Sequence, residues 1–223
     1  MPARRTQLIG KLTASSALCL LLAVPVYAAY EFAGDEDYLT AASALPAWSE
    51  MLARHARDQQ LIRQCIDDES TCEGRLRSMR HVIIKGASLS EDKQLSLVNR
   101  YVNRRMYRRD RTMPAPSVSA NGEEKLRNHW VTLLEFMQRG GDCEDYATAK
   151  YFLLRELGFE ADDMRVLVTW DRRARAYHAV LAVDRGEGTA WLLDSDNRIL
   201  KKSHRQYRFV YAINENGIWL HED

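Results

Sequence analysis

The chain has 223 residues, of which 46% are hydrophobic and 28% are charged, a composition typical of a globular protein with a sizeable core. This composition excludes a wholly disordered chain, a coiled-coil rod and a multi-span membrane protein. Lysine and arginine (32) nearly balance aspartate and glutamate (31), so no global basic charge indicates nucleic-acid binding.

Residues 1–28 have the features of a secretory signal peptide. A basic start is followed by an uncharged run rich in Leu and Ala, which ends in Val26-Tyr27-Ala28. The run is too short for a stable transmembrane span, and an uncleaved anchor is the less favoured alternative. We therefore expect cleavage after Ala28, a periplasmic mature protein with no inserted segment, and one domain over residues 29–223. Cleavage changes the net charge from +1 to −2.

The mature chain would keep three cysteines, Cys65, Cys72 and Cys143. Cysteines of an exported protein usually pair. Cys65 and Cys72 are separated by a polar segment, and a local disulfide is the favoured use, although the spacing also permits two free structural thiols. Cys143 is then the odd thiol, which in an exported protein indicates a special role.

The first half of the mature chain has helical periodicity. An apolar stripe runs from Trp48 to Ile66 and continues over residues 76–83. Ser88-Leu89-Ser90-Glu91 is a capping-box signature, and it predicts a helix whose stripe is Leu95, Val98, Val102 and Met106. A proline-containing loop is expected over residues 113–122. A short helix around residues 130–137 follows, and Gly140-Gly141 ends it.

The second half begins with a helix predicted over residues 142–157, apolar on more than one side and therefore central. Gly158 suits its C-terminal end. Beyond it the pattern predicts strands over residues 164–170, 177–183, 189–193, 208–213 and 217–220, with Asn216-Gly217 as a hairpin signal. Helices followed by an antiparallel meander make an α+β domain.

The chemistry concentrates in the segment Gly140–Ala147. Two glycines turn the chain, and Cys143 then stands at the start of a helix, whose positive end favours a thiolate. His178 lies near the start of one predicted strand and Asp194 directly follows the next. In an antiparallel pair these two positions are neighbours, so a nucleophile, a base and an orienting group can come together. Taken singly, each residue has a commoner structural role: a cysteine buried in the core, a histidine with its hydrogen bonds satisfied, and an aspartate in a turn. The other five histidines do not lie at the start of a predicted strand beside such an aspartate.

The run Gly141-Asp142-Cys143-Glu144-Asp145-Tyr146-Ala147, followed by Ala149–Phe152 and Leu157-Gly158, resembles the nucleophile helix of the bacterial transglutaminase-like cysteine proteinases. Within that family the chain is most similar to the periplasmic, adhesin-cleaving LapG-type proteases. The likeness extends from residues 98–103 and Trp130 to the strands that carry His178 and Asp194.

The resemblance implies a papain-like, transglutaminase-like α+β fold and a triad of Cys143 as nucleophile, His178 as base and acid, and Asp194 as orienting group. It implies cleavage of a large surface adhesin near its N-terminus at a di-alanine site, which releases cells from a biofilm. It also implies control by an inner-membrane receptor that senses cyclic di-GMP and meets this protein only through its periplasmic domain.

The same resemblance implies a calcium requirement, with Asp142, Glu144 and Asp145 as ligands. Three carboxylates beside a turn are a reasonable nucleus for a calcium site. Spacing alone favours another use, since acidic residues in a first helical turn are stabilising without a metal. The third triad position is open in the same way, because the family's Leu-Asp-Asn pattern fits Asp194 or, with a small gap, Asp196.

Two other classes of function fit the residues. One is a transglutaminase or amidase that uses the same triad, and the other is a non-catalytic periplasmic binding protein with a structural Cys143. A further feature is a run of arginines that could dock an acidic partner, for which a solvated helix face is the more favoured interpretation: Arg100, Arg104, Arg105, Arg108, Arg109 and Arg111.

Overall fold

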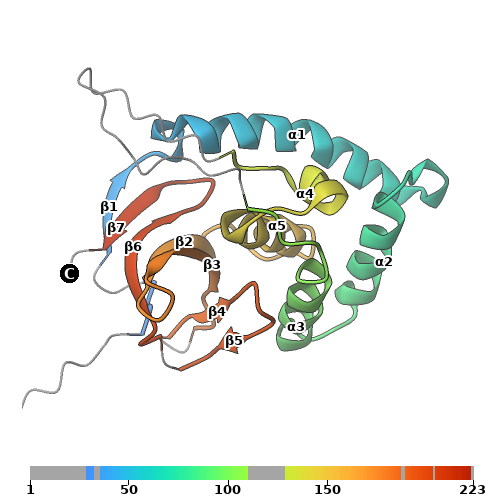
Figure 1. Ribbon diagram of the computed structural model, residues 1–223. Coiled ribbons are helices and arrows are strands. Elements are labelled where there is room, and N and C mark those ends of the chain that lie inside the picture. The colour runs from blue at the N-terminus through green and yellow to red at the C-terminus, as the bar shows by residue number, and fades with distance from the viewer. Residues whose placement is uncertain (1–28, 33–35, 110–128, 187–188, 203, 222–223) are drawn as a thin grey trace, which may run out of the picture.

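The computed structural model describes residues 29–32, 36–109, 129–186, 189–202 and 204–221. The predicted leader over residues 1–28 and the predicted loop over residues 113–122 lie outside these ranges, as does Arg111. Helices cover one side of a curved, seven-stranded antiparallel sheet, and the fold is α+β as the sequence predicted (Figure 1). In the part of the chain that is described, no helix combines the length and the apolar character needed to cross a bilayer.

Five α-helices form the helical layer. They are α1 (Pro46–Asp67), α2 (Leu76–Ala87), α3 (Glu91–Val102), α4 (Leu133–Arg139) and α5 (Cys143–Arg155). Two 3₁₀ turns stand at the two ends of α1, over Ala42–Ala44 and Glu69–Thr71. The predicted apolar stripe of α1 is the face it buries. A disulfide joins Cys65 to Cys72 and fixes the connection from α1 to α2.

The predicted capping box at Ser88–Glu91 is wrong. Ser88 ends α2, and its hydroxyl donates to the carbonyl oxygen of Lys85. The residue that precedes α3 is Ser90, whose side chain makes no capping hydrogen bond. The two helices are too close for Ser88 to serve the second one. A capping box instead opens α4, where Thr132 and Glu135 satisfy each other's backbone N–H groups.

The predicted extension of α3 to Met106 is also wrong. The helix ends at Val102, and the side chain of Met106 is 65% exposed. The reason is tertiary: Tyr107 forms an isolated parallel bridge with Gly141, and the backbone N–H of Arg108 donates to the Gly141 carbonyl at 2.8 Å. This bridge draws the chain out of the helical path and beside the start of α5.

The sheet has the strand order β1-β7-β6-β2-β3-β4-β5. Its strands are β1 (Glu36–Thr40), β2 (Met164–Asp171), β3 (Ala176–Val183), β4 (Trp191–Leu193), β5 (Ile199–Leu200), β6 (Tyr207–Ile213) and β7 (Ile218–His221). The five predicted strands are present with small shifts of their ends. The predicted meander holds only from β2 to β5, because β6 crosses back to pair with the other edge of β2.

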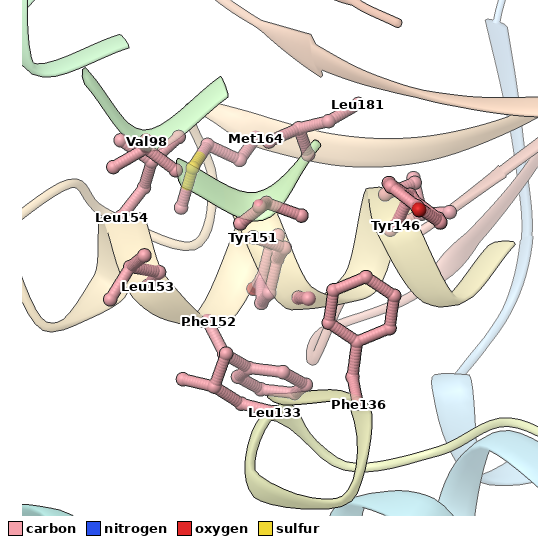
Figure 2. Packing of buried hydrophobic residues seen from close by; sticks show 14 of the residues in the cluster. Val98, Leu133, Phe136, Tyr146, Tyr151, Phe152, Leu153, Leu154, Met164 and Leu181 are labelled. Carbon is pink, nitrogen blue, oxygen red and sulfur yellow. The ribbon is translucent and has the colours of Figure 1, made fainter. Parts of the chain in front are cut away.

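Helix α5 lies at the centre, between the sheet and the other helices (Figure 1). Tyr151, Phe152, Leu153 and Leu154 are at most 2% exposed. Figure 2 shows Phe152 near Leu133 and Phe136 of α4 on one side of α5, while Val98 of α3 and Met164 and Leu181 of the sheet pack on another. Burial on every side holds α5, and therefore its first residue Cys143, rigidly against the sheet.

Candidate active site

The start of α5 is built by a close approach of three segments. Gly140 has φ +75°, and a Cβ there would meet the carbonyl oxygen of Met106 at 2.0 Å. A Cβ on Gly141 would meet the carboxylate of Asp145 at 2.2 Å. The Asp145 carboxylate accepts the backbone N–H groups of Asp142 (3.2 Å) and Val131 (3.0 Å). The glycine pair therefore allows the tight turn that places Cys143 at the first position of the helix.

The Cys143 sulfur lies against strand β3. The backbone N–H of Ala179, the residue after His178, lies close enough to the sulfur to favour the thiolate and lower the pKa of Cys143. Its thiol also donates to Glu144 Oε2 at 3.2 Å. The sequence predicted that a central helix would bring Cys143 to the strand of His178, and these contacts place the sulfur there.

The surroundings of Cys143 favour the protonated thiol in the resting protein. Burial, followed by the charge of Glu144, its hydrogen bond and the charge of Asp142, raises the pKa of Cys143. The Ala179 N–H opposes this rise. Burial and the neighbouring Asp142 carboxylate also raise the pKa of Glu144 to about 8. A base must therefore take the thiol proton if Cys143 is to act as a nucleophile.

Such a base is available in His178. Its Nε2 lies 2.8 Å from Asp194 Oδ1, and its side chain is 19% exposed. With Nε2 engaged by the carboxylate, Nδ1 is the ring nitrogen left for proton exchange with the thiol. Asp196, the alternative orienting residue, has a side chain that is 49% exposed and pairs with Arg198. Only the Asp194 interpretation agrees with these contacts.

The Asp194 carboxylate is held from several sides. Oδ1 accepts the backbone N–H of Ser195 at 2.7 Å, and Oδ2 accepts the Tyr207 hydroxyl at 2.5 Å and the Arg198 guanidinium at 3.0 Å. Burial alone would raise the pKa of Asp194, but His178, Tyr207 and the Ser195 N–H together lower it below the usual range. The carboxylate therefore stays charged, which keeps the imidazole oriented and stabilises its protonated form.

The backbone of Asp194 is fixed as firmly as its side chain. Its carbonyl oxygen accepts Lys150 Nζ at 2.8 Å and Asn103 Nδ2 at 2.8 Å. Lys150 belongs to α5 and is fully buried, and burial lowers its pKa to about 7. The roles of Lys150, Asn103 and Tyr207 were not predicted from the sequence. The signal that could have found Lys150 is a charged residue inside a helix predicted to be apolar on more than one side.

The predicted metal ligands are only partly gathered. The carboxylates of Asp142 and Glu144 share a hydrogen bond beside Cys143, whereas each oxygen of Asp145 already accepts a backbone N–H. In the described ranges, no group of three His, Cys, Asp or Glu side chains has a geometry that could hold a metal ion. The donor chemistry of the Asp142–Glu144 pair fits calcium, and the calcium site remains a prediction.

The sequence profile of the bacterial transglutaminase-like cysteine proteinases matches residues 55–221. The chain belongs to this family. The match spans α5, which begins with Cys143, and every strand from β2 to β7.

Solved structures of Legionella pneumophila LapG share the fold. LapG is 27% identical to this chain, with a TM-score of 0.59, over 71% of this chain and 87% of LapG. The calcium-bound form of LapG gives a TM-score of 0.60 at 27% identity, and the match covers 72% of this chain and 86% of the LapG chain. The EGTA-treated form gives a TM-score of 0.59 at 27% identity, and the match covers 71% of this chain and 84% of the LapG chain. No curated protein matches the chain.

Proposed function

We propose that this cysteine proteinase is a calcium-dependent endopeptidase of the periplasm that cleaves a large surface adhesin. One observation carries the proposal: the Cys143 sulfur lies against β3 beside His178, and His178 is hydrogen-bonded to a charged, fully anchored Asp194. This is the order of nucleophile, base and orienting group that thiol proteases require.

The proposed reaction proceeds through an acyl-enzyme. His178 takes the proton of Cys143, and the sulfur attacks the peptide carbonyl carbon. The C–N bond then breaks as the imidazolium gives its proton to the leaving amine. Water, deprotonated by His178, next attacks the thioester and releases the acid and the thiol. Asp194 stays ionised throughout and stabilises the imidazolium.

Calcium would be held by Asp142 and Glu144 through their carboxylate oxygens. A bound cation supplies positive charge that offsets the two carboxylates flanking the nucleophile. Asp145 would act mainly as the residue that closes the first turn of α5. The supporting observations are the shared hydrogen bond of the Asp142–Glu144 pair and the calcium-bound form of a related LapG.

The substrate, the compartment and the regulation come from the likeness to LapG-type proteases and from residues 1–28. The leader-like sequence supports export. The proposed substrate is the N-terminal region of a large adhesin, cut at a di-alanine site, which frees cells from a biofilm. The proposed regulator is the periplasmic domain of an inner-membrane cyclic di-GMP receptor.

The test is a cleavage assay on the purified mature protein with an N-terminal fragment of the host's largest repeat adhesin. Products are identified by mass spectrometry with calcium, with chelator and with Cys143→Ser. A single cut that disappears in the chelator and in the variant supports nucleophile, metal and substrate together. Ammonia release without a cut would favour the transglutaminase or amidase alternative. A Cys143 thiol that resists alkylation, with no cut, would favour a non-catalytic binding protein.

A further inference from the structure

An arginine-rich segment lies directly beside the nucleophile. Residues 104–109 are fixed there by two backbone contacts: the Tyr146 hydroxyl donates to the Arg105 carbonyl at 2.6 Å, and the Arg108 N–H donates to the Gly141 carbonyl at 2.8 Å. The ring of Tyr107 stacks on Tyr146 at 5.9 Å between centroids. Because backbone atoms make the anchoring contacts, the side chains of this segment are left for other uses.

A second arginine-rich segment stands next to His178. The turn from β2 to β3 is rigid, since the Asp171 carboxylate accepts the backbone N–H groups of Arg173 (2.8 Å) and Ala174 (3.0 Å). Two residues after Arg175, Tyr177 is 64% exposed and its ring packs edge-on against Trp170 at 5.2 Å. In the β2–β3 pairing Asp171 lies opposite Ala176, two residues before His178, so this turn is close to His178 in the strand.

The two segments share the same surface chemistry. Each presents exposed arginines together with an exposed tyrosine: Arg104, Tyr107, Arg108 and Arg109 beside Cys143, and Arg173, Arg175 and Tyr177 beside His178. No salt bridge engages these five arginines within the described residues. Elsewhere Arg54, Arg155 and Arg185 each pair with a glutamate. Both segments therefore carry exposed positive charge that no acidic side chain of the described residues pairs with.

We infer that these two segments form a cationic, aromatic docking surface for the substrate, and that the polypeptide bound there carries Asp and Glu on both sides of the scissile bond. The inference rests on the proposed protease function and adds its substrate class. Arginine guanidinium groups bind carboxylates through paired hydrogen bonds, and tyrosine rings pack against apolar side chains.

The inference is tested by binding, without turnover. The mature protein with Cys143→Ala is titrated into fluorescein-labelled peptides that have Ala-Ala at the centre, flanked by Asp and Glu or, in the matched peptide, by Lys. Fluorescence anisotropy gives the Kd. We expect the acidic peptide to bind at least about tenfold more tightly at low ionic strength, with the difference shrinking as salt is added. Equal binding, or binding of neither peptide, overturns the inference.

Charge reversal locates the surface. Arg108→Glu with Arg173→Glu changes two exposed side chains and leaves the backbone contacts in place. This double variant should lose the preference for the acidic peptide. The control reverses Arg57 and Arg63, which are exposed on α1, and should retain it. A preference that survives in the Arg108/Arg173 variant places the docking surface elsewhere and overturns the inference. Circular dichroism checks the fold, and each single variant repeats the test if the double variant unfolds.

Cleavage of the same peptides by the unmutated protein separates the two proposals. We expect a higher kcat/KM for the acidic peptide, through a lower KM. Equal kcat/KM values for the two peptides would leave the protease and remove the docking surface. No cleavage of either peptide, with the binding preference intact, would leave the surface and count against the proposed endopeptidase.

Discussion

Acid should destabilise this protein through one buried histidine of α1. His55 is 4% exposed, its ring lies 3.6 Å from that of Phe152 between centroids, and neither ring nitrogen has a hydrogen-bond partner in the described structure. Burial lowers the pKa of His55 from 6.5 to about 4. The unfolded chain therefore binds the proton more readily than the folded chain. The contribution of His55 to stability is fully present above about pH 6.5 and is lost as the pH falls toward 4.

The size of the effect follows from the two pKa values. Linkage gives a loss of about 2 kcal/mol in the free energy of unfolding between about pH 7 and about pH 5 from this residue. His55→Leu keeps a similar volume against Phe152 and removes the proton site. The measurement is urea unfolding of both proteins at the two pH values.

The difference in stability between the His55→Leu variant and the unmutated protein isolates His55 from the carboxyl groups that titrate in the same range. We expect the variant to gain about 2 kcal/mol relative to the unmutated protein on acidification. An identical pH dependence in the two proteins would refute the reasoning and would mean that the imidazole is satisfied in some other way.

Three further predictions concern the catalytic centre. Lys150→Met removes one hydrogen-bond donor to the Asp194 carbonyl and should lower kcat by about tenfold with little change in KM. Steady-state kinetics on a cleaved peptide measures both constants. An unchanged kcat would mean that Asn103 alone fixes this backbone. Tyr207→Phe removes a hydrogen bond that lowers the pKa of Asp194, so the acid limb of the rate profile should move to higher pH, and an unmoved limb would contradict that role. Calcium should raise the Tm and chelator should reverse the rise, and Asp142→Asn should abolish the response; a response that persists in the variant would place the metal elsewhere.

Local pattern in the sequence predicted most of the helices and strands. The helical stripes and the five predicted strands repeat within single segments, where the period of apolar residues decides the element. Strand β1 was missed because Glu36–Thr40 begins with two acidic residues and has no run of apolar residues, so only its pairing with β7 makes it a strand. Strand β5 has two residues and depends wholly on β4. The return of β6 to β2 was missed because the pairing of distant strands leaves no local mark.

The sequence named the three candidate triad residues, whereas the residues that support them were not predicted. Cys143 begins α5, His178 lies near the start of β3 and Asp194 directly follows β4, and the neighbourhood of antiparallel strand ends brings the last two together. Tyr207 and Asn103 reach Asp194 from β6 and from the end of α3. Their roles arise only when distant segments pack, and tyrosine and asparagine are common enough that neither position is conspicuous in the sequence.

Lys150 shows why the supports matter to the chemistry. It lies two turns after Cys143 in the same helix, and its ammonium holds the backbone of Asp194. The helix that carries the nucleophile is thus bonded directly to the residue that orients the base. A buried lysine is expensive to desolvate, and its placement is accounted for by this link. Helix α5 is packed on all sides, and the hydrogen bond from Lys150 links it to the backbone of Asp194. The position of Cys143 relative to the His178–Asp194 pair is therefore fixed by the core, which is the preorganisation that nucleophilic catalysis requires.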